Sequence, residues 1–149
     1  MFKFVPLARM ISTAENADLP PETLSNPADL RPEFKAGRGI GVITLGERHF
    51  FFRRFRTVYY LPYERISRYF RRVETVSTRI GCCTGDVNVE NVVICVQGRA
   101  SGREREVAQI EMPGRKAALA LMEELSRRAP NALSGRPEKP VPAQSETRT

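Results

Sequence analysis

The hydrophobic pattern of the chain changes from strand-like to helix-like near Pro113. Before Pro113, runs rich in Phe, Tyr, Val and Ile predict strands, because bulky or branched side chains pack well on a pleated surface. The expected strands cover residues 40–45, 49–55, 58–63, 65–76, a short stretch at 87–89, 91–97 and 104–112. After Pro113, Ala118, Leu121, Met122 and Leu125 follow i, i+3, i+4, i+7 spacing. This spacing predicts an amphipathic helix over residues 114–129.

Proline-rich segments lie on both sides of this expected folded body, residues 37–130. Residues 1–36 are expected to form an N-terminal extension that packs partly on the body through Phe4, Leu7 and Phe34. Because proline disrupts helices and central strands, residues 17–34 are expected to be irregular chain with a short helix at 21–24. Residues 131–149 are poor in apolar side chains and are predicted to form a disordered tail. No apolar run reaches the ~20 residues needed to cross a bilayer, and the N-terminus does not have the pattern of a secretory signal.

Aromatic residues and positive charge gather in one part of the chain. Nine of the twelve aromatic residues lie between Phe50 and Phe70, and residues 37–76 carry nine basic and three acidic residues. In one interpretation the aromatic residues fill a core, and the arginines keep the outer face in water. In the other, the arginines bind anions, because a guanidinium offers a planar fork of donors to phosphate or carboxylate. The candidate partner-binding residues are Arg53, Arg54, Arg56, Arg68, Arg71 and Arg72.

The residue types that most often hold metal ions are few. Cys82, Cys83 and Cys95 with His49 have no Cys-x-x-Cys spacing, so no metal site and no cofactor is predicted. Cys95 falls inside an apolar run and is interpreted as a small buried hydrophobe. Three cysteines make a poor disulfide framework and fit a reducing cytoplasm.

No segment supplies the groups of a catalytic site together. The glycines at positions 37, 39 and 41 lack the Lys-Ser/Thr pair of a phosphate loop and are expected to be structural glycines entering a strand. His49 has no evident acidic partner in the sequence, and the carboxylates of Asp86 and Glu90 lie four residues apart in a turn-rich segment. Without a nucleophile, a base and an orienting group, no catalytic residue is predicted and an enzyme is the least favoured class.

The order of these elements resembles the pleckstrin-homology-like (PH-like) fold in its small bacterial form. The matching segments are ITLGERHFFF, TVYYLPYERI leading into a long strand, and MPGRKAALALMEEL as the closing helix. The resemblance implies an α+β, mainly antiparallel fold, in which a bent sheet or barrel of about seven strands is closed by one C-terminal amphipathic helix. Members of this class mostly bind phosphoinositides, peptides or proteins, and most are not enzymes.

The resemblance and the regional charge together predict a non-catalytic cytoplasmic binding or scaffolding module. Its expected partner is acidic: a protein or peptide first, and an anionic lipid headgroup or membrane surface second. The alternative is a single-stranded nucleic-acid-binding protein that stacks bases and holds phosphates on an Arg/aromatic sheet surface. The sequence leaves the identity of the partner and the oligomeric state open.

Overall fold

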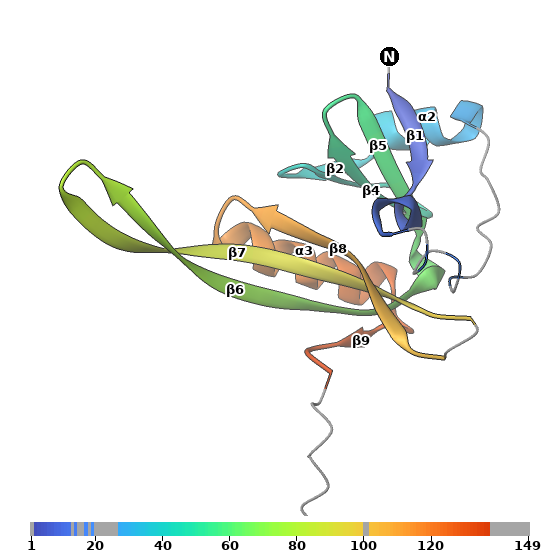
Figure 1. Ribbon diagram of the computed structural model, residues 1–149. Coiled ribbons are helices and arrows are strands. Elements are labelled where there is room, and N and C mark those ends of the chain that lie inside the picture. Colours follow the sequence, from blue (N-terminus) through green and yellow to red (C-terminus); the bar gives the residue numbers. More distant parts are fainter. Residues whose placement is uncertain are drawn as a thin grey trace, which may run out of the picture.

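The computed structural model describes residues 2–12, 14, 17, 19, 27–99 and 102–137. Its fold is α+β and consists mostly of strands, which form one five-stranded and one four-stranded sheet (Figure 1). The α-helices α2 (Pro27–Ala36) and α3 (Arg115–Arg128) accompany the sheets. No helix among the described residues is long and apolar enough to span a membrane.

The first sheet has the strand order β1-β5-β4-β3-β2. Its strands are β1 (Lys3–Pro6), β2 (Arg38–Ile40), β3 (Ile43–Leu45), β4 (His49–Arg54) and β5 (Thr57–Pro62). Strands β2 to β5 are antiparallel neighbours, whereas β1 runs parallel to β5 and forms the edge. The 3-10 helix η1 (Leu7–Met10) follows β1 and buries Leu7.

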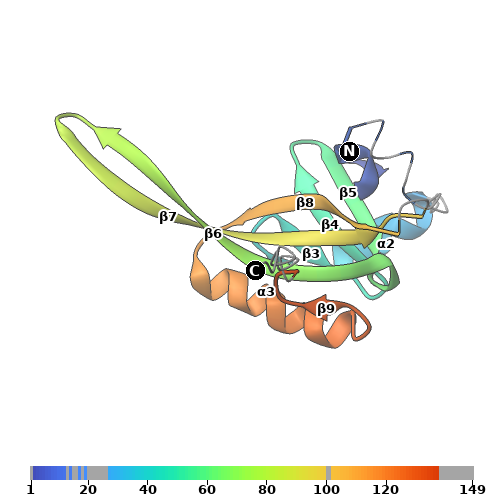
Figure 2. The ribbon, with the colours of Figure 1, turned by 60° about the horizontal axis from the view of Figure 1, so that its bottom comes forward.

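The second sheet has the strand order β8-β7-β6-β9. It contains β6 (Ile66–Ile80), β7 (Cys83–Gln97), β8 (Glu104–Met112) and the short β9 (Leu133–Ser134), and β6 follows the 3-10 helix η2 (Tyr63–Arg65). Helix α3 runs along this sheet (Figure 2) and contacts β2 of the other sheet. As the apolar stripe predicts, Ala118, Leu121 and Leu125 are fully buried in the core.

Two hydrophobic clusters lie on opposite faces of the first sheet, and the triplet Phe50-Phe51-Phe52 contributes to both. Phe50 and Phe52 point into the main core between the sheets and α3. Phe51 points to the other face, where it is buried beneath α2 with Leu30, Val58 and Tyr60. Because neighbouring residues in a strand face opposite ways, three consecutive phenylalanines require a cover on both faces. Helix α2 supplies the second cover, and Phe4 of the edge strand β1 packs against the same cluster.

Helix α2 is an element that the sequence reasoning did not anticipate; the short helix expected at 21–24 lies outside the described residues. The prolines of this segment argued for irregular chain, but Pro27 stands at the start of α2, where a missing N–H costs little. Leu30 and Phe34 are four residues apart on one face and meet the sheet. Their burial outweighs the cost of Pro32 inside the helix. Phe4, Leu7 and Phe34, expected to join the N-terminal segment to the body, all contact these clusters.

The expected count of about seven strands and a single helix is therefore not what the described residues show. The strand expected at 40–45 is two strands, separated by a turn in which Gly41 has a φ of +61°. Neither β1 nor β9 was expected: β1 lies in the N-terminal extension, and β9 lies in the segment predicted to be a disordered tail. β9 pairs parallel with β6 at Arg68 and Tyr69, so the described fold continues past residue 130; residues 138–149 lie outside the described part.

Strands β6 and β7 extend well beyond the body as a two-stranded arm (Figures 1 and 2). The arm comprises the pairs from Val73↔Glu90 to Ile80↔Cys83, and a two-residue turn, Gly81-Cys82, closes it. At ~3.4 Å per residue the arm is roughly 25 Å long. Residues 77–91 were expected to be turn-rich apart from a short strand at 87–89, which is wrong: all of them except the turn Gly81-Cys82 belong to β6 and β7. Polar residues are acceptable on both faces of this ribbon because the body covers neither face.

Candidate binding surface

The six candidate arginines fall into two groups in the structure. Arg68, Arg71 and Arg72 belong to β6 and form ion pairs with glutamates of the same sheet. Arg68 Nε lies 2.8 Å from Glu104, Arg71 Nε lies 2.9 Å from Glu90, and Arg72 Nη2 lies 2.5 Å from Glu106. These three guanidinium groups are therefore largely neutralised within the fold.

Arg72 also covers an apolar patch on the outer face of the second sheet. Phe70, Val93 and Cys95 form a small buried cluster there. The Arg72 guanidinium lies 5.3 Å from the centre of the Phe70 ring, and Arg72 Nη1 donates a hydrogen bond to Gln109 Oε1 at 2.8 Å. A register shift between Ile66 and Arg68, as expected for a bulge, allows this strand to bury residues on both faces. The contact of Arg72 with Phe70 is of the kind expected where arginines shield apolar surface.

Arg53, Arg54 and Arg56 lie together at the exposed end of the β4–β5 hairpin. We call this segment, with Phe55, the hairpin end. Among the described residues no carboxylate forms an ion pair with these three arginines, although Arg53 lies 5.4 Å from the centre of the Phe2 ring. Their charges therefore remain available to a partner.

Phe55 stands at the tip of this hairpin and is 90% exposed. Its φ of +55° lies in the left-handed region, which is a genuine outlier for an aromatic residue. The two-residue loop Phe55-Arg56 between the paired residues Arg54 and Thr57 forces this conformation. A hollow of about 700 Å³ adjoins the hairpin end, and Val42, Phe52 and Met112 are among its lining residues. An exposed aromatic side chain surrounded by three arginines has the composition of a protein-binding surface.

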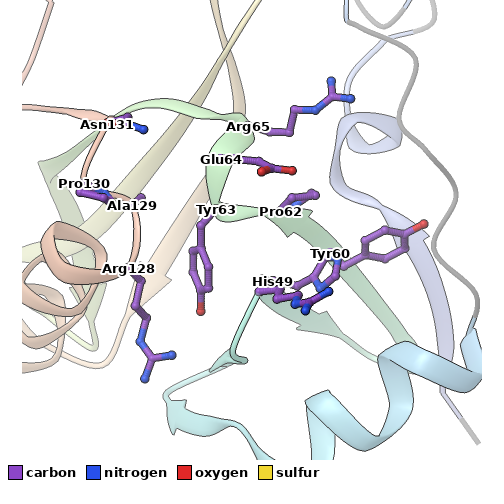
Figure 3. Close-up of a pocket in the computed structure, with 11 residues that line it drawn as sticks. His49, Tyr60, Pro62, Tyr63, Glu64, Arg65, Arg128, Ala129, Pro130 and Asn131 are labelled. Atoms are coloured by element: carbon purple, nitrogen blue, oxygen red, sulfur yellow. The ribbon is translucent and has the colours of Figure 1, made fainter.

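A second candidate site is a cleft of about 590 Å³ between η2 and the C-terminal end of α3 (Figure 3). Its polar groups hold the fold together. The Tyr63 hydroxyl donates to the Gly46 carbonyl at 2.7 Å, and Arg128 donates to the same oxygen at 2.8 Å and to Glu124 at 3.0 Å. Burial raises the pKa of Tyr63 to about 12, and the hydrogen bond from Arg128 lowers the pKa of the Glu124 carboxyl. Glu124 also pairs with Arg38 of β2 and so joins α3 to the first sheet.

His49, on the wall of this cleft, has an acidic partner that the sequence reasoning missed. Its Nδ1 lies 3.0 Å from Glu33 Oε1, and Glu33 Oε2 accepts hydrogen bonds from the backbone N–H groups of Arg48 and His49. Glu33 belongs to α2, so no signal could have found it once that segment was taken as irregular. Gly46 permits the approach, because a Cβ there would lie 2.2 Å from the Glu33 carboxylate. The residues that line the cleft include no Ser, Thr or Cys to serve as a nucleophile.

The structure does not bring the remaining candidate groups together. Cys82 and Cys83, the tip thiols, are exposed at the end of the arm, whereas Cys95 is buried in the outer-face cluster. Burial raises the pKa of the Cys95 thiol to about 12, in keeping with a buried hydrophobe. Asp86 accepts a hydrogen bond from Ser77 and Glu90 pairs with Arg71, so these two carboxylates have separate partners.

Comparisons with protein-family models, curated proteins and solved structures find no match for this chain.

Proposed function

We propose that the protein is a non-catalytic binding or scaffolding module that recognises an acidic partner through the hairpin end. The observation that carries the proposal is the division of the arginines. Glutamates neutralise the three candidate arginines of β6, whereas Arg53, Arg54 and Arg56 stay exposed around the protruding Phe55. Arginine and aromatic side chains are the residue types that contribute most to binding energy at protein interfaces.

The burial of most aromatic residues favours an acidic protein or peptide over single-stranded nucleic acid. Stacking of bases needs exposed aromatic faces along a sheet. In this fold Phe50, Phe51, Tyr60, Tyr69 and Phe70 are buried. Phe55 is a single exposed ring on a convex tip, which suits insertion into a partner better than stacking of successive bases.

We also propose that strands β2 to β8 with α3 form a PH-like unit, to which β1, α2 and β9 are additions. Four antiparallel strands, then three antiparallel strands and then a helix is the order that the class would have. A cytoplasmic location in a bacterium belongs to the same proposal, and it is supported by the exposed, unpaired tip thiols. Because a fold class does not determine function, the proposed recognition of an acidic partner rests on the hairpin end and not on the PH-like unit.

A charge-reversal experiment tests the proposal. The triple variant Arg53→Glu, Arg54→Glu, Arg56→Glu is compared with the unchanged chain in three assays. These are pull-down from native lysate, flotation with phosphatidylcholine vesicles with and without phosphatidylserine, and anisotropy with single-stranded RNA at two salt concentrations. We expect an acidic protein or peptide to bind the unchanged chain and to be lost by the variant.

The matched control reverses three other exposed cations, Arg9, Arg115 and Lys116, and should retain the partner. If both variants lose the partner, binding depends on the overall charge of the protein and not on the hairpin end. An unchanged partner list with no vesicle binding by either form would leave the hairpin end without a recognition role. Steep salt-dependent RNA binding that the triple variant loses would favour the nucleic-acid alternative instead.

A further inference from the structure

A small apolar groove lies between β1 and α2, on the outer side of the first sheet. It has a volume of about 370 Å³, and its lining residues are Phe2, Phe4, Arg31, Phe34 and Lys35. Almost all of its wall is apolar, so the two cations line it with their aliphatic stems and hold their charges at the rim. We call it the aromatic groove.

The rings of the aromatic groove are held in fixed positions by the buried cluster beneath them. Phe34 meets Phe2, Phe4 and Phe51 edge-to-face, with ring centres 5.6, 5.9 and 5.4 Å apart. Phe51 is fully buried, so the contacts continue into the core. Arg53 of the hairpin end covers one side of Phe2 and joins the two surfaces. A groove with preordered walls loses little conformational entropy when a side chain enters it.

The groove adjoins an edge of the sheet to which no other described strand is paired. β1 is the last strand of its sheet, and β5 is its neighbour on the other side. The backbone N–H of Lys3 donates to Arg56 O at 2.9 Å. Because backbone groups alternate in direction along a strand, those of Phe4 point away from β5. An extended segment can therefore pair with β1 beside the groove.

Charge indicates the character of that segment. Arg31 and Lys35 lie at the rim, Arg53 lies behind Phe2, and none of the lining residues is acidic. A segment with acidic residues beside one large apolar residue complements this surface in both charge and polarity. The groove is concave, whereas an apolar surface that enters a bilayer has to protrude. The edge-to-face rings, one of them covered by Arg53, offer no flat platform to a nucleobase.

We propose that the aromatic groove binds an acidic extended peptide, which seats one aromatic or large aliphatic side chain between Phe2, Phe4 and Phe34. The peptide adds a strand to the edge of β1, and its acidic residues meet Arg31 and Lys35. This inference rests on the proposed function, because it names the acidic partner as a peptide and adds a specificity pocket beside the hairpin end.

The experiment selects peptides from a random display library on the full chain and measures the enriched peptides by fluorescence polarisation. We expect the enriched set to share one large apolar residue flanked by Asp or Glu. Phe2→Ala should weaken their binding about tenfold, the effect of removing one aromatic anchor. The double variant Arg31→Glu, Lys35→Glu should lose them and select peptides with Lys or Arg instead. Backbone NMR shifts on titration should centre on Phe4 and Phe34.

Three comparisons make the outcome decisive. The control Arg115→Glu, Lys116→Glu should bind as the unchanged chain does. The double variant Arg54→Glu, Arg56→Glu keeps Arg53 over Phe2; if it alone abolishes binding, the hairpin end is the site and the groove is not. If only the groove variants lose peptide, the groove stands and the proposed role of the hairpin end falls. The peptide assignment is overturned by enriched peptides without acidic residues, by no enrichment, or by vesicle binding that Phe2→Ala removes.

Discussion

Leu30 of α2 provides the sharpest test of how the N-terminal segment is held. Its side chain is 1% exposed and packs on the outer face of the first sheet against Phe51, Val58 and Tyr60. Leu30→Ala removes three carbon atoms, for which the transfer term is about 2.4 kcal/mol at ~0.8 kcal/mol per CH₂. Strands β4 and β5 form the floor of this site and cannot collapse into the space, so a cavity term adds to the loss. The total should be about 3–4 kcal/mol, within the usual range for buried leucines.

The measurement is urea unfolding followed by circular dichroism, with the free energy of unfolding extrapolated at a common m-value. Leu119→Ala is the matched control, because Leu119 lies on α3 and is 44% exposed. It should change the free energy of unfolding by no more than about 0.5 kcal/mol. If Leu30→Ala costs less than about 1 kcal/mol, α2 does not cover the sheet as described. The aromatic groove would then lack its fixed wall.

Three further predictions concern chemistry and the chain end. The tip thiols should react with a thiol reagent at neutral pH within the folded protein, whereas Cys95 should react only on unfolding; early labelling of all three thiols would contradict its burial. Burial raises the pKa of Tyr63 from 10.0 to about 12. The contribution of the neutral Tyr63 side chain to the free energy of unfolding is therefore complete below pH 10 and is lost as the pH rises through 12. Tyr63→Phe should lessen the alkaline loss of stability, and an unchanged pH profile would refute this role. A chain ending at Pro137 should be more stable than one ending at Ala132, because the shorter chain lacks the hydrogen bonds that join Gly135 to Tyr69 and Arg68; equal unfolding midpoints would show that β9 contributes nothing.

The sequence predicted secondary structure and burial correctly where these depend on the spacing of neighbouring residues. The stripe of apolar residues in α3 marked its buried face, and the run 91–97 marked the buried part of β7. The run Phe50-Phe51-Phe52 was correctly placed in a strand, but the sequence did not show that both faces of this strand are covered. The cover of the second face is a tertiary contact with α2, and the prolines of that segment predicted irregular chain. A buried leucine overrode the local preference.

The candidate binding surface was predictable only in part, for a related reason. The six candidate arginines are close together in the sequence. Whether each one is neutralised depends on glutamates that lie far along the chain, such as Glu104 and Glu106 in β8. Pairing across strands decides which arginines are neutralised, and one sequence does not reveal that register. The aromatic groove draws on residues from β1 and α2, which come together only in the folded sheet.

The arm has a consequence for the order in which the protein folds. β6 and β7 meet through a two-residue turn, so their first contacts close a very short loop, and hairpins of this kind form in about 1–10 μs. β1 instead pairs with β5 across more than fifty residues, and this long loop closes against a larger entropy cost. We therefore expect substitutions at the Gly81-Cys82 turn to change the folding rate, and substitutions in β1 to change mainly the unfolding rate. The edge on which the aromatic groove depends is then completed last and opens first.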